Sequence, residues 1–232
     1  IAAAHITAAS NLEDDNRARQ LQKIVSASKR RNLIPAADLS GLSQLIKKAP
    51  DDLKIAAIAA AGQWKLEDHR QTLEDLATKK KTPPAMRSSA INALAAMGGE
   101  STQTLLAKLT DPKEEINTRI TATRALLTLS PEEAAQNIIS LLSDPETKDP
   151  AALYRDFVKV EGGVAALIAA LKGATLPAEI AKIGERAISA SGRKHSDLIA
   201  ALSIAGNLDE GPDEFTPAQL AKMVEAVQKN GN

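Results

Sequence analysis

The three histidines are the side chains best suited to bind a metal or to transfer a proton near neutral pH. They are His5, His69 and His195, which lie far apart in the sequence, with no pair at a spacing of four residues. A metal site needs three or four ligands that converge on one point. We therefore interpret the histidines as surface or helix-cap residues and expect no metal site.

Acidic side chains occur in pairs that could in principle serve as a general acid and base. The pairs precede or begin predicted helices, where negative charge complements the helix dipole, so position alone explains them. No Gly-x-Ser-x-Gly, Walker or Gly-x-Gly-x-x-Gly motif is present, and the 232 residues include no cysteine. We expect no catalytic residue, no cofactor-binding residue and no enzymatic activity. The acidic pairs are Asp14-Asp15, Glu114-Glu115 and Glu132-Glu133.

Two basic clusters could bind phosphate groups, Lys29-Arg30-Arg31 and Lys79-Lys80-Lys81, and Trp64 lies between them in the sequence. Nucleic-acid binding would need a continuous positive groove with aromatic contacts, and DNA repair would also need a catalytic acid. The chain has 29 basic and 29 acidic residues and only 2% aromatic residues. We expect no nucleic-acid partner, and a nucleic-acid-binding or DNA-repair enzyme domain is the alternative.

The composition indicates helices that pack closely on one another. Hydrophobic residues make up 44% of the chain, with few aromatic residues, so the core must consist of Ala, Leu and Ile. Small side chains let helices approach closely, as in stacked helix pairs. No apolar run reaches the ~20 residues of a membrane span, so we expect no membrane insertion.

Residues 86–112 predict two short helices joined by a tight turn. Ala90, Ala93, Leu94 and Met97 recur at helical spacing. Gly98-Gly99 is expected to end this first helix, because glycine adopts positive φ without strain. Ser101 or Thr102 could cap the second helix, whose apolar residues are Leu105, Leu106 and Leu109.

The same pattern recurs along the chain. Asp144-Pro145 repeats Asp111-Pro112 at an interval of 33 residues, and Arg119 takes the place of Arg87. Upstream, Asp51 or Asp52 is expected to cap a helix that Gly62 ends, and downstream Ser130-Pro131 should begin a helix. A pair this small needs similar neighbours to bury its apolar face. The period fits helical repeats of the HEAT type, although it is a little shorter than their usual ~40 residues.

We therefore predict an all-α fold, a right-handed α-solenoid of HEAT-like antiparallel helix pairs. Residues 51–208 would form the repeats, and residues 1–50 would form a helical segment that caps the array, with a short helix over residues 36–49. Residues 209–232 are interpreted as a linker and C-terminal helix that lead to a further domain.

The C-terminal third resembles the HEAT-like segment of large exported bacterial haem-binding proteins, the PVC-type CxxCH family. In that family this segment lies between a dehydrogenase-like β-propeller and a c-type cytochrome domain. The CxxCH motif is absent from this chain, so haem c is expected only in a downstream domain. The residues that carry the resemblance are Ala169-Ala170-Leu171-Lys172-Gly173-Ala174, Leu176-Pro177, Ala187, Ser191-Gly192-Arg193, Leu198, Ala201-Leu202, Ala205-Gly206 and residues 220–232.

The resemblance implies a periplasmic or exported scaffold that positions a haem domain against other domains. Its partners would be proteins or neighbouring domains of the same polypeptide. In such arrays the second helix of each pair normally lines the concave surface. The candidate partner contacts are therefore the polar residues Gln71, Gln103, Lys108, Gln136 and Asn137.

Overall fold

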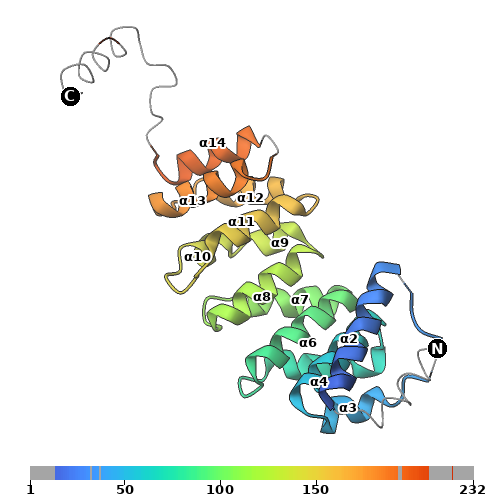
Figure 1. Cartoon of the computed structure of the whole chain (residues 1–232). Helices are drawn as coiled ribbons and strands as arrows, with labels where there is room; N and C mark the ends of the chain where they lie inside the picture. Colours follow the sequence, from blue (N-terminus) through green and yellow to red (C-terminus); the bar gives the residue numbers. More distant parts are fainter. Residues whose placement is uncertain (1–13, 32, 37, 193–194, 209–220, 222–232) are drawn as a thin grey trace, which may run out of the picture.

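The helices stack along one axis in two rows, from the N-terminal to the C-terminal part of the chain (Figure 1). The structure is a computed structural model that describes residues 14–31, 33–36, 38–192, 195–208 and 221. These residues contain no β-strand and form an all-α solenoid. Residues 1–10 with His5 lie outside the described residues, as does the expected C-terminal helix in residues 217–229 apart from residue 221.

The first row consists of helices that pack on one another in chain order. Its members are α2 (Asp14–Arg31), α4 (Asp51–Gln63), α6 (Pro84–Met97), α8 (Ile116–Leu127), α11 (Pro150–Lys159) and α13 (Ala178–Ser189). The second row covers one side of the first. Its members are α3 (Leu42–Lys48), the 3-10 turn η2 (Glu67–His69) with α5 (Arg70–Thr78), α7 (Glu100–Leu109), α9 (Pro131–Ala135), α10 (Ile138–Leu142), α12 (Gly163–Leu171) and α14 (Ser196–Ala205).

The core lies between the two rows and is built from Ala, Leu and Ile, as the composition predicts. The three described aromatic side chains, those of Trp64, Tyr154 and Phe157, are also buried. Both α2 and α3 pack against α4, which places the N-terminal segment on the first pair of the array. No helix within the described ranges is long and apolar enough to cross a lipid bilayer.

The expected turn in residues 86–112 is present, but its second helix begins differently from the prediction. Gly98 ends α6 with φ +74° and Gly99 follows with φ +96°, so both need the freedom of glycine. Gly99 is the N-cap of α7, and neither Ser101 nor Thr102 caps it. Thr102 lies inside the first turn, where its hydroxyl donates to the Gly98 carbonyl. Arg70 donates to the same hydroxyl oxygen at 2.7 Å, so Thr102 joins α5 to α7.

Gly62 does not end α4, which continues to Gln63. A methyl group at position 62 would overlap the backbone of Ala93 on α6. Glycine is therefore required at position 62 because α4 and α6 are in close contact there, and not because it ends the helix. The start of α4 also differs from the prediction, since Pro50 is the N-cap and neither Asp51 nor Asp52 forms a capping hydrogen bond.

Two other helices are shorter than the sequence predicts. The helix expected over residues 36–49 begins only at Leu42, because Asp38 accepts a hydrogen bond from the Ser40 amide and holds a turn there. The helix that starts at Pro131 is capped by Ser130 as predicted. It is interrupted after Ala135, and Asn137 donates to Thr110 of the preceding unit at 2.9 Å.

Two buried arginines occupy equivalent positions of α6 and α8, but only Arg87 reaches into the next unit. Arg87 donates to Glu115 at 2.8 Å, to the Lys79 carbonyl at 3.0 Å and to Thr118 at 3.2 Å. Arg119 donates to Asp144 at 2.7 Å and to Ser140 at 2.9 Å. Both side chains are about 95% buried, at 5% and 4% exposure. The internal repeat therefore extends to the buried arginine itself but not to its acceptors, because Ser140 lies in the same unit as Arg119 whereas Thr118 lies in the unit after Arg87.

Candidate functional site

Three adjoining hollows form a groove along the first row, here called the first-row groove. The first has a volume of about 680 Å³ and lies over the C-terminal parts of α2, α4, α6 and α8. The second, of about 290 Å³, shares Arg124 and Thr128 with the first. The third, of about 310 Å³, shares Lys159 with the second. The shared residues show that the three hollows adjoin one another along the first row.

The groove follows from the choice of small side chains on the first-row helices. Ala95 and Ala96 of α6 and Ala125 of α8 line the first hollow, and Ala187 and Ala190 of α13 line the third. Larger side chains at these positions would fill the space between neighbouring helices. The alanines that allow close helix packing therefore also leave the surface recessed.

The charges that line the first-row groove are strongly unequal. Five cationic side chains line it, and Asp156 is the one carboxylate among the described residues that do so. Asp156 is already paired, since its carboxylate lies 2.7 Å from Nε of Arg124. A chain with no net charge thus concentrates positive charge on one surface. The five cationic residues are Lys29, Lys65, Arg124, Arg155 and Lys159.

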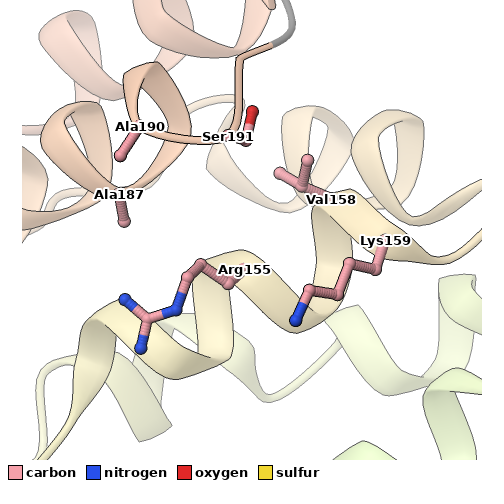
Figure 2. Close-up of a pocket in the computed structure, with 6 residues that line it drawn as sticks. All are labelled: Arg155, Val158, Lys159, Ala187, Ala190 and Ser191. Atoms are coloured by element: carbon pink, nitrogen blue, oxygen red, sulfur yellow. The ribbon is translucent and has the colours of Figure 1, made fainter.

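The third hollow lies between α11 and α13 (Figure 2). The side chains of Arg155 and Lys159 extend in the same direction from α11, while Ala187 on α13 points toward α11. Arg155 has an acidic neighbour at its other side, Asp149, at 3.5 Å. Both side chains of that ion pair are exposed, so the pair contributes little to stability. Arg155 could therefore give up Asp149 for a carboxylate of a ligand.

The candidate partner contacts from the sequence lie on the second row, away from the first-row groove. Gln71 on α5 is exposed and donates to Asp75, and Gln103 on α7 is half-buried. Lys108 on α7 lines a separate hollow of about 410 Å³ together with Glu74 and Glu100. Gln136 and Asn137 lie at the interruption between α9 and α10. The structure does not bring all five together in one hollow, and their role in partner binding stays a prediction.

The residues considered for catalysis are dispersed. His69 precedes α5 and His195 precedes α14, in different units. Within the described residues, no group of three or more His, Asp or Glu side chains could hold a metal ion. The paired acids lie at helix starts, and the buried polar residues in the described ranges include no carboxylate.

Carboxyl groups with a perturbed pKa serve structural contacts and lie outside the first-row groove. A hydrogen bond from the Glu146 amide, with a further contribution from Arg119, lowers the pKa of Asp144. Arg70 likewise lowers the pKa of Glu67. Lys79 and Gln71 lower the pKa of Asp75. These shifts favour the ionised form, which suits ion pairing and not the role of a general acid.

Both basic clusters are exposed but have different surroundings. Lys29 lines the first-row groove, whereas Lys79 pairs with Asp75 at the end of α5. Trp64 is 1% exposed, so it belongs to the core and offers no ring to a nucleic-acid base. Over the residues that the structure describes, a positive surface is therefore present without the exposed aromatic ring that nucleic-acid binding would use.

Residues 39–118 match the family model of HEAT repeats. The match begins just before α3 and ends in the first turn of α8, so it covers the best-defined repeats and about a third of the chain. This part is a HEAT-like repeat segment. HEAT repeats are generally scaffolds for protein interactions and are typically non-enzymatic. No curated protein and no solved structure matches the chain.

Sequence reasoning missed the first-row groove, although a signal for it exists. Cations lie at or near the C-terminal ends of α2, α4, α8 and α11, at Lys29, Lys65, Arg124 and Lys159. Each one alone is explained by the helix dipole. Only the stacking of the first-row helices shows that these ends share one surface.

Proposed function

We propose that the chain is a non-enzymatic protein-interaction scaffold. The observation that carries this proposal is the repeat array itself, which matches HEAT repeats over residues 39–118 and exposes the first-row groove. A stack held together by neighbour-to-neighbour contacts presents a long surface of fixed shape, which suits the binding of other proteins. The second-row residues Gln71, Gln103, Lys108, Gln136 and Asn137 are proposed as an additional contact surface.

Within this role, we propose that the chain is the spacer next to a c-type cytochrome domain in a larger exported bacterial redox protein. The resemblance to the PVC-type haem-binding segment, which covers most of the chain from about residue 50 and is clearest after residue 160, supports this. A rigid spacer is useful there because electron transfer falls off steeply with distance. The test is to read the residues that follow Asn232 in the parent protein and to stain the full-length product for covalent haem. A CxxCH motif with a haem-positive band supports the spacer role, and its absence removes the redox setting.

Amide hydrogen exchange tests the scaffold role independently of haem. We expect slower exchange in the first-row or second-row helices when this chain is part of the full-length parent protein than when it is isolated. Slower exchange on α5, α7 and α10 would support the second-row contacts. Unchanged exchange on both rows, with the parent intact, would contradict a scaffold that contacts its own polypeptide.

A nucleic-acid-binding or DNA-repair domain is the second candidate, favoured by the five cations of the first-row groove. Such binding would weaken steeply as salt is raised, because phosphate contacts release counterions. The test is a titration of labelled duplex DNA at two salt concentrations. Micromolar binding with a steep salt dependence would support this candidate against the protein scaffold.

A further inference from the structure

We propose that the first-row groove binds an extended, acidic segment of a partner protein, with apolar side chains between its carboxylates. This inference rests on the proposed scaffold function and specifies the chemistry of its partner. The groove extends over several first-row helices, and four of the residue types that line it bear on the chemistry of its ligand: cations, one carboxylate, apolar side chains and carboxamides.

Charge complementarity indicates an acidic partner. The groove is lined by five cations and by one carboxylate that is already bound to Arg124. The cations are distributed along the groove, with Lys29 and Lys65 near one end, Arg124 between the first two hollows and Lys159 between the last two. A compact anion could contact only one of these positions. A chain of carboxylates could contact several at once.

Apolar side chains at the groove indicate what lies between those carboxylates. Leu33 and Ile34, at the first hollow, are 56% and 60% exposed and are among the most exposed large hydrophobic residues described. Val160, which is half-buried, adds apolar surface at the second hollow, whereas Leu127 and Val158 line the second and third hollows but are buried. A groove with both cationic and apolar residues favours a peptide that carries both carboxylate and apolar side chains.

The polar uncharged residues of the first hollow are suited to a peptide backbone. Gln63 and Asn92 line it, and each carboxamide carries both a donor and an acceptor. An extended segment presents unpaired backbone amides and carbonyls that need such partners. Phosphate groups would use only the donors. The carboxamides thus favour a peptide as the ligand.

The buried aromatic residues weigh against a nucleic acid in this groove. Trp64, Tyr154 and Phe157 are each 1% exposed, so none can stack on a base. The exposed Leu33 and Ile34 would face a sugar-phosphate backbone without benefit. The groove therefore combines positive charge with apolar contacts, which fits an acidic protein segment better than DNA or RNA.

The experiment measures fluorescence anisotropy of a labelled peptide made of repeated Glu-Leu-Ser triplets, titrated with the full 232-residue chain. A length of about fifteen residues spans about 50 Å when extended, which matches the six first-row helices that line the groove, stacked about 10 Å apart. The groove variant carries Lys29→Glu, Lys65→Glu and Lys159→Glu. The matched control carries Lys113→Glu, Lys148→Glu and Lys172→Glu, which are exposed, lie outside the groove and change the net charge equally.

We expect the groove variant to weaken peptide binding by about tenfold or more, and the control variant by less than about threefold. Asp156→Asn, which removes the groove's carboxylate, should tighten binding by about threefold. Replacing Leu by Ser in the peptide should weaken binding, since the apolar contacts are lost. Circular dichroism of each variant verifies that the helices are intact.

Equal weakening of peptide binding in both triple variants would overturn the proposal, because the effect would then come from the net charge of the protein and not from the groove. Tighter binding of labelled single-stranded or duplex DNA than of the peptide would also overturn it in favour of a nucleic acid. If the peptide fails to bind while hydrogen exchange shows protection of the second row in the parent protein, the inference fails and the scaffold survives. If neither row is protected, the proposed function fails as well.

Discussion

Arg87 on α6 donates a hydrogen bond of 2.8 Å to Glu115, which directly precedes α8, and so spans the boundary between two units of the stack. The two partners are very unequal in exposure, at 5% for the Arg87 side chain and 68% for Glu115. Arg87 also donates to the Lys79 carbonyl and to Thr118. The guanidinium is therefore the central group of this junction, and the carboxylate is one of several acceptors around it.

We predict that Arg87→Ala lowers the free energy of unfolding by about 2–3 kcal/mol. The substitution removes three hydrogen bonds and the buried stem of the side chain, and leaves acceptors unpaired. Glu115→Ala should cost less than about 1 kcal/mol, because an exposed carboxylate contributes little and Arg87 keeps its other acceptors. Urea denaturation measures both values. Equal losses for the two variants would show that the ion pair, and not the buried guanidinium, holds the junction.

The contact between α4 and α6 gives a second prediction. Gly62→Ala should destabilise the protein by about 2 kcal/mol or more, because the added methyl group would overlap the backbone of Ala93. In a helix without this contact, alanine in place of glycine would stabilise the protein by about 1 kcal/mol. A loss of stability in Gly62→Ala would therefore indicate the overlap with Ala93, and a gain would indicate helix propensity alone. Gly41→Ala is the control, since a methyl group there meets no atom within 4 Å. A neutral or stabilised Gly62→Ala variant would mean that the two helices can separate at little cost.

Asp144 is expected to make stability depend on acidic pH. Its folded-state pKa is lowered by the Glu146 amide and by Arg119. A lowered pKa contributes stability that is present above the unfolded-state pKa of about 4 and is lost as the pH falls through the folded value. Asp144→Asn should therefore be less stable at pH 7 and show a shallower decline below pH of about 4.

Urea midpoints from neutral to acidic pH measure this difference. Ser140→Ala is the control, because it removes the other acceptor of Arg119 at 2.9 Å without removing a titrating group. It should lower stability by a similar amount at every pH. If Asp144→Asn instead declines in parallel with the wild type, the carboxylate is not the source of the acid sensitivity.

The sequence predicts the helix pairs well because their information is local. The apolar spacing in α6, the glycines at its end and the Ser130 cap each depend on residues within a few positions of one another. Even the equivalence of Arg87 and Arg119 is visible as a repeat, although their acceptors are not. Those acceptors lie twenty or more residues later or in a preceding loop, and their position depends on how the helices stack.

Gly62, Thr102 and the first-row groove show where local reasoning is insufficient. Glycine and threonine both have ordinary explanations as helix ends and caps, and those predictions were wrong here. Gly62 is needed by a helix that begins more than twenty residues later, and Thr102 accepts a hydrogen bond from Arg70. The groove likewise joins residues from Lys29 to Ser191. Gln71, Gln103, Lys108, Gln136 and Asn137 stay predictions, since their role depends on a partner.

The buried arginines have a consequence for anyone who divides this chain. Arg87 lies in one unit and two of its acceptors, Glu115 and Thr118, lie in the next. A cut in the loop between α7 and α8 would respect every helix boundary and still leave an almost fully buried guanidinium without most of its acceptors. The chain is therefore best divided at a boundary between units that no arginine hydrogen bond crosses, and a helix end alone is not a sufficient criterion. The ends of a shortened version should therefore be placed so that each buried arginine keeps its acceptors, and the repeat length alone should not decide them.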